Sequence, residues 1–323
     1  MSLFARVNGR RAELVPSLRP IRSPMVLGDW RCLAVAVNLL SAAPISPEVK
    51  AKNPEAQPEG ANLPGRVTEE GVWVVDTHFH LDRLTRELGL SITAPYGDII
   101  RGVGPAPAGQ SVGIKGVVTS FCDPQFFPSL MGVEELITRE VYTTVGVHPK
   151  SVPSVTRQER ELMFQLWDSR RLVGYGEVGL DRTTHPYERV AQEEFLQELL
   201  RWVPPEGVLV LHARGVPWDR LNMQPILRLL SLCQASGIPS MQYIQLHCFQ
   251  GSTDLVNRWR EAFPNTFFSV NNGVGSFDTD QLAGLKSVPS DRLILETDGP
   301  HFAPRGYSHF IFGSYEYFPP GLC

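Results

Sequence analysis

Histidines and carboxylates with metal-binding spacing recur along the chain, and the most compact group is a histidine pair. The segment VVDTHFHLD places His78 and His80 two residues apart, directly after a short β-branched run at residues 73–76. Successive side chains of a strand point to opposite faces, so residues two apart point the same way. His78 and His80 can therefore bind one ion together, although an H-x-H pair alone is only moderately specific.

Five further candidate residues share one position, since each ends or directly follows a strand-like run. They are His148 in TTVGVHPK, Glu177 in YGEVGLD, His212 in VLVLHAR, His247 in IQLHCF and Asp298 in LILETD. Burying several ionisable groups together is costly unless opposite charge compensates them. Divalent cations would supply that compensation.

The types of donor atom narrow the choice of metal. Nitrogen and oxygen donors without cysteine suit Zn, Mn, Ni, Fe or Mg better than a thiolate-bound structural zinc. One ion cannot easily use all of the collected donors, whereas two ions bridged by a carboxylate such as Glu177 can. We therefore expect two divalent metal ions, with Mg, Zn or Mn as the candidates.

Such a site needs a scaffold that brings distant strand ends together. From residue 71 onward, short strand-like runs alternate with helical patterns such as residues 157–170 and 192–202, which is typical of repeated βα units. Strands are predicted at residues 73–76, 114–121, 142–147, 172–178, 208–212, 243–247, 266–271 and 293–298. Eight such units fit an α/β fold, the TIM-type (β/α)8 barrel, whose active sites lie at the carboxyl ends of the strands. An open doubly wound sheet has the same periodicity, so the position of the polar residues decides for the barrel.

Composition and charge exclude several classes of protein. The chain has 323 residues, of which 42% are apolar, and no apolar run approaches the ~20 residues of a membrane span. Its five cysteines form no C-x-x-C pair, which argues against a disulfide framework and for a reducing compartment. The net charge of −4 argues against a broad basic face that binds nucleic acid. An anionic substrate would need a local source of positive charge.

Three regions are predicted along the chain. Residues 1–70 contain scattered prolines and read as a low-order extension or linker, residues 71–305 form the barrel, and residues 306–323 form an atypical tail. The arginine-rich start would suit a mitochondrial presequence, but its prolines would interrupt the amphipathic helix. We expect an intracellular protein, cytoplasmic or nuclear, that is a monomer and has no membrane partner.

Six motifs resemble the ordered motifs of the TatD family of metal-dependent nucleases. They are VVDTHFHLD, VGVHP, GEVGLD, VLHAR, QLHCFQGS and ILETDGPHFAP. The segment TSFCDPQFF is further similar to metazoan TatD-domain-containing proteins. The resemblance covers about residues 72–305 and implies a barrel of the metallo-dependent hydrolase type with two metal ions. Its six ligands would be His78, His80 and Asp298 for the first ion, His212 and His247 for the second, and Glu177 between them.

The resemblance also implies an activity, the hydrolysis of DNA or possibly RNA as a 3'–5' exonuclease or an end- or lesion-processing deoxyribonuclease. Two close divalent ions lower the pKa of a bound water and hold the attacking and leaving oxygens of a phosphodiester. Asp298 would take the proton of that water, and His148, if protonated, would oppose the charge on the phosphoryl oxygens. Arg214 and Asp181 match substrate-contacting or supporting positions.

Two alternative functions stay open. The first is an amidohydrolase-type barrel enzyme that acts on a small ester or amide, since the same ligands serve that chemistry. Related binuclear enzymes often bridge their metals with a modified lysine, whereas the fourth strand here supplies Glu177. The second is a truncated, non-catalytic family member, because the family usually continues after FAPRG into a further helical region and this chain has the short aromatic segment YSHFIFGSYEYFPPGLC. The intact ligand set argues against it.

Overall fold

Eight parallel strands that alternate with helices make up the described part of the protein. The computed structural model describes residues 72–94 and 112–301. The strands follow one another around a single sheet in sequence order, and each pairs in parallel with the next. The predicted (β/α)8 barrel is therefore confirmed. The predicted extension 1–70 and tail 306–323 lie outside the described residues.

All eight predicted strands are present, with small differences at their ends. The strands are β1 Val72–Phe79, β2 Val112–Phe121, β3 Val141–Val145, β4 Gly174–Asp181, β5 Val208–Arg214, β6 Tyr243–Leu246, β7 Thr266–Val270 and β8 Leu293–Leu295. The helices are α2 Leu81–Glu87, α4 Leu130–Thr138, α5 Arg157–Asp168, α6 Pro186–Leu199, α7 Met223–Ser236, α8 Thr253–Ala262 and α9 Thr279–Ser287. Short 3₁₀ turns at Pro124–Phe126, Pro149–Ser154, Asn272–Ser276 and Ser290–Arg292 complete the connections. No helix in these ranges is long and apolar enough to cross a membrane.

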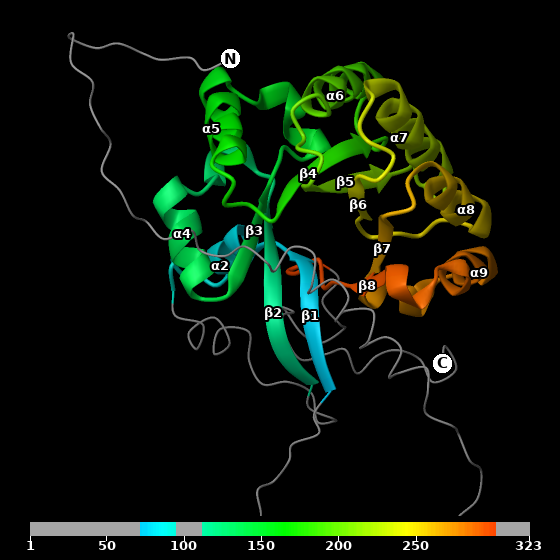
Figure 1. The fold of residues 1–323 in the computed structure, drawn as a ribbon, viewed down its shortest axis with the longest axis horizontal. Helices are drawn as coiled ribbons and strands as arrows, with labels where there is room; N and C mark the ends of the chain where they lie inside the picture. The colour runs from blue at the N-terminus through cyan, green and yellow to red at the C-terminus, as the bar shows by residue number, and fades with distance from the viewer. Residues whose placement is uncertain (1–71, 95–111, 302–323) are drawn as a thin grey trace, which may run out of the picture.

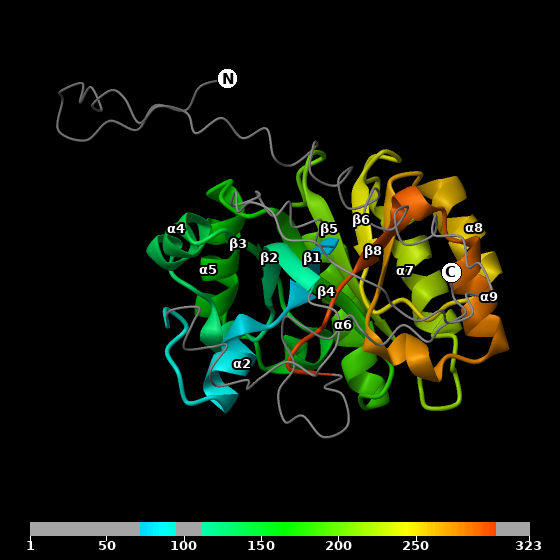
Figure 2. The ribbon, with the colours of Figure 1, turned by 90° about the horizontal axis from the view of Figure 1, so that it is seen from below.

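The helices surround the strands and bury the apolar core against the outer face of the sheet. Figure 1 shows α4 and α5 on one side of the strands and α8 and α9 on the other, and Figure 2 shows the same arrangement from below. The largest fully buried side chains include Trp259 of α8, Met163 of α5 and Phe268 of β7. This packing holds the strands at fixed positions, so their carboxyl ends form one rim.

Helix α6 begins earlier than the sequence pattern indicates. Residues 192–202 were predicted, whereas the helix spans Pro186–Leu199. Pro186 occupies its first turn, where the missing N–H costs nothing, and Glu188 accepts a hydrogen bond from His185 N. These capping signals lie outside the apolar periodicity, which is why periodicity alone misplaced the start.

The barrel closes where the exit of β8 meets the end of β1. Asp298 N donates to His78 O at 2.9 Å, and His80 N donates to Gly299 O at 2.7 Å. These two backbone hydrogen bonds join segments about 220 residues apart in sequence. They set His78 of β1 and His80, which directly follows β1, beside the aspartate that follows β8.

A buried carboxylate strengthens this closure. Asp76 of β1 accepts hydrogen bonds from Thr297 Oγ1 at 2.6 Å, from Thr297 N at 3.0 Å and from His78 N at 3.2 Å. Burial raises the pKa of Asp76 to about 7, against the lowering effect of the Thr297 hydrogen bonds. Asp76 thus ties together the backbone on both sides of the closure.

Candidate metal centre

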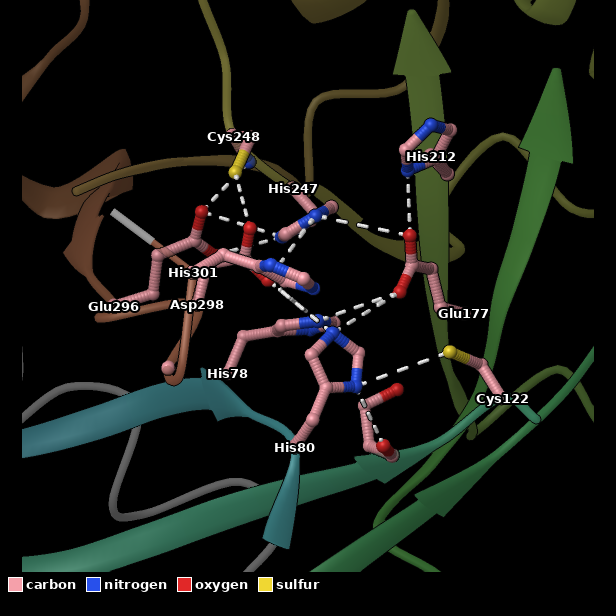
Figure 3. A network of polar contacts seen from close by, with 12 residues as sticks. His78, His80, Cys122, Glu177, His212, His247, Cys248, Glu296, Asp298 and His301 are labelled. Carbon is pink, nitrogen blue, oxygen red and sulfur yellow. Dashed lines mark hydrogen bonds and ion pairs between the residues drawn. The ribbon is translucent and has the colours of Figure 1, made fainter. Parts of the chain in front are cut away.

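The predicted site residues converge on a cavity of about 460 Å³ at the carboxyl ends of the strands. Figure 3 shows most of them pointing toward one another. Those that line the cavity are His80, His148, Glu177, His212, Arg214, His247 and Asp298. His78 is fully buried directly behind them, and Asp181 lies behind His212. The structure therefore brings all nine predicted residues into one region.

Glu177 stands at the middle of the cluster, and its two oxygens contact different histidines. Oε2 lies 3.5 Å from His78 Nε2 and 3.7 Å from His80 Nε2. Oε1 lies 2.5 Å from His212 Nδ1 and 3.7 Å from His247 Nε2. One carboxylate therefore faces two separate histidine pairs, which is the geometry of a bridging ligand.

Asp298 completes the group formed by β1. Its Oδ1 lies 3.2 Å from His80 Nε2 and 3.9 Å from His78 Nε2. The same oxygen is also 3.9 Å from His247 Nε2, and the ring of His247 stacks on that of His78 at 3.9 Å between centroids. His247 thus sits between the two predicted metal sites rather than in one alone.

A second layer of acceptors orients two of the histidines. His80 Nδ1 lies 2.9 Å from Ser120 O, and His247 Nδ1 lies 3.2 Å from the Glu296 carboxylate. Each Nδ1–H donates outward, so each Nε2 faces the cluster. Sequence reasoning missed Glu296, which also accepts from Ser269 Oγ at 2.6 Å. Its position two residues before Asp298, in the strand alternation, was the signal that could have found it.

Asp181 supports His212 rather than facing the cavity. Its Oδ2 lies 3.7 Å from His212 Nε2 and 3.5 Å from Lys150 Nζ, and its Oδ1 accepts from Thr183 N at 2.8 Å. The side chain is fully buried and does not line the cavity. Gly179 allows this approach of β4 to β5, because a Cβ there would collide with the His212 carbonyl oxygen.

The carboxylates and imidazoles of the cluster shift one another's pKa in opposite directions. Burial raises the pKa of Glu177, but His247 and His212 outweigh burial and hold that pKa well below its ordinary value. Burial disfavours the charge on His247, yet Glu296, Asp298 and Glu177 raise the pKa of His247 to about 10. The pKa of His212 is raised in the same way, against burial, by Glu177 and Asp181. Metal ions at this site would replace those protons.

His148 differs from these histidines because it is neutral at pH 7. Burial and the neighbouring His212 lower the pKa of His148 to about 3. Its Nδ1 accepts a hydrogen bond from Lys150 N at 3.1 Å, so the single ring proton resides on Nε2, 3.8 Å from Glu177 Oε1. His148 is therefore a neutral hydrogen-bond donor, rather than the protonated group that the sequence-based mechanism considered.

The donor set fits divalent cations. Within the described ranges, several buried atoms have no hydrogen-bond partner, namely His78 Nε2, Glu177 Oε2, Asp298 Oδ1 and both ring nitrogens of His212. Ligand atoms of His78, His80 and Glu177 lie within 4.8 Å of one another, as do those of His148, Glu177 and His212. Buried polar atoms without partners are costly in a folded protein, and a cation satisfies them.

Comparison with known proteins agrees with this geometry. A family model described as "TatD related DNase" matches residues 75–314. The chain belongs to the TatD family. The family predicted from the motifs is confirmed.

Individual TatD relatives are distant. The human protein named "3'-5' RNA nuclease TATDN2" is 26% identical over 261 residues, covering 79% of this chain and 31% of the relative. The "3'-5' ssDNA/RNA exonuclease TatD" of Cronobacter sakazakii is 27% identical over 171 residues, covering 51% of this chain and 59% of the relative. This chain therefore spans about a third of the human relative. The crystal structure of YjjV, a TatD homologue of Escherichia coli K12, covers 72% of this chain and 82% of YjjV with a TM-score of 0.54. The two sequences are 21% identical, and the likeness supports the fold.

Other residues of this TatD cavity were not singled out from the sequence. Arg83 binds Asp123 through two hydrogen bonds of 2.9 Å and contacts His301 Nε2 at 3.0 Å. All three residues line the cavity. Arg83 lies one turn into α2 after His80, so its direction depends on the helix and could have been predicted only once the helix was known.

A cysteine also touches the cluster, although no thiol was expected there. Cys248 Sγ donates to Asp298 Oδ2 at 3.5 Å and accepts from Asn271 Nδ2 at 2.9 Å. Burial and the nearby Asp298 raise the pKa of Cys248 well above its ordinary value, so it stays a thiol. This contact gives Asn271 a structural role beside the cluster.

Proposed function

We propose that this chain is a two-metal phosphodiesterase that removes nucleotides from the 3' end of single-stranded DNA or RNA. The observation that carries the proposal is the division of the Glu177 oxygens between two histidine sets. The names of the human and Cronobacter relatives support the substrate class, since both include a 3'-5' nuclease activity. A carboxylate in the bridging position also favours the nuclease over an amidohydrolase that bridges its metals with lysine.

The six clustered ligands support a division into two ion sites, with His247 near both. We propose His78, His80 and Asp298 for one ion and His212 and His247 for the other, with Glu177 shared. Two such ions lower the pKa of a bound water and hold the attacking and leaving oxygens of the phosphodiester. Their identity, as Mg, Zn or Mn, stays a prediction, as do the monomeric state and the cytoplasmic or nuclear location.

Asp298 is suited to accept the proton of the attacking water. It lines the cavity, and although burial raises the pKa of its carboxyl, His247 and His80 hold that pKa below its ordinary value, so the group is ionised at pH 7. A general base must be ionised and within hydrogen-bond reach of the proton that it takes. We therefore keep the predicted catalytic role for Asp298.

Two further side chains are suited to bind the phosphate. His148 presents its Nε2–H to the cavity side of Glu177, where it can donate to a phosphoryl oxygen while neutral. Arg214 lines the cavity, and its guanidinium makes no hydrogen bond or ion pair with any described residue. The other two cations of the lining, Arg83 and Lys150, are paired with Asp123 and Asp181. Among the described arginine and lysine side chains of this wall, Arg214 is therefore the one left for a substrate.

A strand-degradation assay tests the proposal. Single-stranded DNA and RNA of one sequence, labelled at the 5' end, are incubated with the protein and Mg²⁺, Mn²⁺ or Zn²⁺, with and without EDTA. We expect divalent-dependent release of mononucleotides from the 3' end, which Glu177→Gln reduces by about 10³-fold or more, or ~4 kcal/mol of activation free energy. Circular dichroism confirms that the variant is folded.

The matched control is Glu194→Gln, because Glu194 is an exposed glutamate of α6 away from the cavity. It should retain full activity. Degradation that survives both EDTA and Glu177→Gln would falsify the proposal. Turnover of a small ester or amide with nucleic acid left intact would instead favour the amidohydrolase-type activity.

A further inference from the structure

The connection between β5 and α7, residues 215–222, carries an exposed tryptophan beside the metal-centre cavity. Trp218 is 82% exposed, more than any other large hydrophobic side chain in the described ranges. It follows Arg214 and Gly215 on the turn that leaves β5 directly after His212. A single exposed apolar side chain is common on protein surfaces, so its surroundings decide whether it binds a ligand.

The backbone of this turn is held by a set of hydrogen bonds. Gly215 N donates to Asn222 Oδ1 at 2.7 Å, which closes the turn at its base. Asp219 N donates to Val216 O at 2.8 Å, and the Asp219 carboxylate accepts from Met223 N at 2.8 Å. Trp218 therefore projects from a braced turn. An aromatic side chain held on such a turn loses little conformational freedom when a ligand stacks on it.

A second cavity connects this turn to the metal centre. Its volume is about 470 Å³, and its lining includes Pro217 and Asp219, the two neighbours of Trp218 in sequence. Arg214, Asn222 and Gln250 line both this cavity and the metal-centre cavity. The two hollows therefore adjoin at Arg214, and Trp218 stands on the turn that borders the second of them.

The charges along this path suit a nucleic-acid backbone. Arg220 is paired with Asp278 at 2.7 Å, and both Asp219 oxygens accept from backbone N–H groups at the start of α7. The guanidinium of Arg214 is the charge on this path with no partner among the described residues. Proteins that bind single strands combine cations, which contact the phosphates, with exposed aromatic rings, on which the bases stack.

We propose that Trp218 is a stacking platform for an unpaired nucleobase of the substrate, and that Arg214 binds the phosphate between this base and the scissile bond. The proposal rests on the proposed phosphodiesterase function. It adds a binding subsite away from the metals, and it explains a selectivity for unpaired strands, because a paired base has both faces covered by its neighbours and cannot stack on a side chain.

The test combines a substitution in the protein with a deletion in the strand. Affinity for a fluorescein-labelled single-stranded oligonucleotide is measured by anisotropy in EDTA, where hydrolysis does not occur. Trp218→Ala should weaken binding by about 5- to 150-fold, and Trp218→Phe should restore most of it. Trp202→Ala is the matched control, since Trp202 is 62% exposed but precedes β5 at the opposite end of the barrel, and it should bind like the unchanged protein.

Oligonucleotides with one abasic position identify stacking itself. Moving the abasic position along the strand should reveal one site at which the unchanged protein loses affinity. Trp218→Ala should show no additional loss at that site, because the base and the ring form one interaction. A merely structural role of Trp218 would give losses that add, and additive losses would overturn the proposal.

A small substrate separates this proposal from the proposed function. Bis(p-nitrophenyl) phosphate has no base to stack, so its metal-dependent hydrolysis should be the same with Trp218→Ala as with the unchanged protein. If that hydrolysis and strand cleavage both occur and Trp218→Ala changes neither cleavage nor affinity by more than twofold, the stacking platform is refuted and the function stands. If no phosphodiester is hydrolysed, the function fails, and the anisotropy measurement still decides for or against Trp218.

Discussion

His80 and His247 differ from His212 in how their outward-facing nitrogen is held. His80 donates to Ser120 O at 2.9 Å and His247 donates to the Glu296 carboxylate at 3.2 Å, so each ring has one directional hydrogen bond behind it. His212 lies between two carboxylates, with Glu177 at 2.5 Å and the other partner, Asp181, at 3.7 Å. The first pair is oriented by hydrogen bonds, and the third histidine is held mainly by charge.

This difference indicates which part of the metal centre is arranged before an ion binds. A short hydrogen bond to Nδ1 fixes both the tautomer and the plane of the ring, so Nε2 of His80 and of His247 already points at the cluster. The attraction of the Glu177 and Asp181 carboxylates for His212 depends only weakly on angle. It therefore holds the ring in place without fixing its orientation. We expect perturbations of the hydrogen-bonded side to cost more metal affinity than perturbations behind His212.

The largest predicted effect is a dependence of metal affinity on pH, and it involves both His247 and His212. Carboxylates raise the pKa of His247 to about 10, so this ring carries a proton at pH 7 that a metal must displace, and carboxylates raise the pKa of His212 in the same direction. Affinity should therefore rise with pH, by about tenfold per pH unit for each proton released. If one proton is released, competition with a chelator should show a metal affinity about 100-fold higher at pH 8 than at pH 6. An affinity that is flat or falls with pH would contradict the protonation scheme.

Glu296→Gln tests the hydrogen-bonded side. The amide cannot accept from His247 Nδ1 as the carboxylate does, and it removes the charge that holds this ring in place. Metal affinity should fall by about 10- to 100-fold, the usual range for an acceptor behind a ligand. Ser269→Ala removes the 2.6 Å hydrogen bond to Glu296, together with the hydroxyl's contacts to Gln245 and Leu246, but keeps the Glu296 charge, so this variant should lose less metal affinity. Equal losses in the two variants would show that Glu296 acts through packing and not through His247.

Asp181→Asn tests the side held by charge and should have the smallest effect. The 3.7 Å contact to His212 Nε2 is weakened, while the closer contact to Glu177 remains, so metal affinity should fall by less than about tenfold. The same chelator competition measures it. A larger loss of metal affinity in Asp181→Asn than in Glu296→Gln would contradict this expectation. It would show that His212 depends on Asp181 more strongly than His247 depends on Glu296.

Much of the barrel and of the site was open to prediction from the sequence. The alternation of side chains in a strand placed His78 and His80 on one face, and the recurrence of polar residues at strand ends placed the others at one rim. The family motifs supplied the set of six proposed ligands, which the structure brings into one cluster. The helix start at Pro186 was missed, because caps are read from single residues and not from apolar spacing.

Other features were decided only by the packed barrel. Asp181 faces His212 because β4 and β5 are neighbours, whereas Glu296 reaches His247 from the exit of β8, beyond the intervening β7. The left-handed backbone of Asp298, with φ of 53°, is held by the closure against β1. Local sequence patterns record which face of a strand a side chain takes, since that depends on the φ and ψ of adjacent residues. The distance between atoms on different strands depends on twist, register and packing around the whole barrel, so only the tertiary structure determines it.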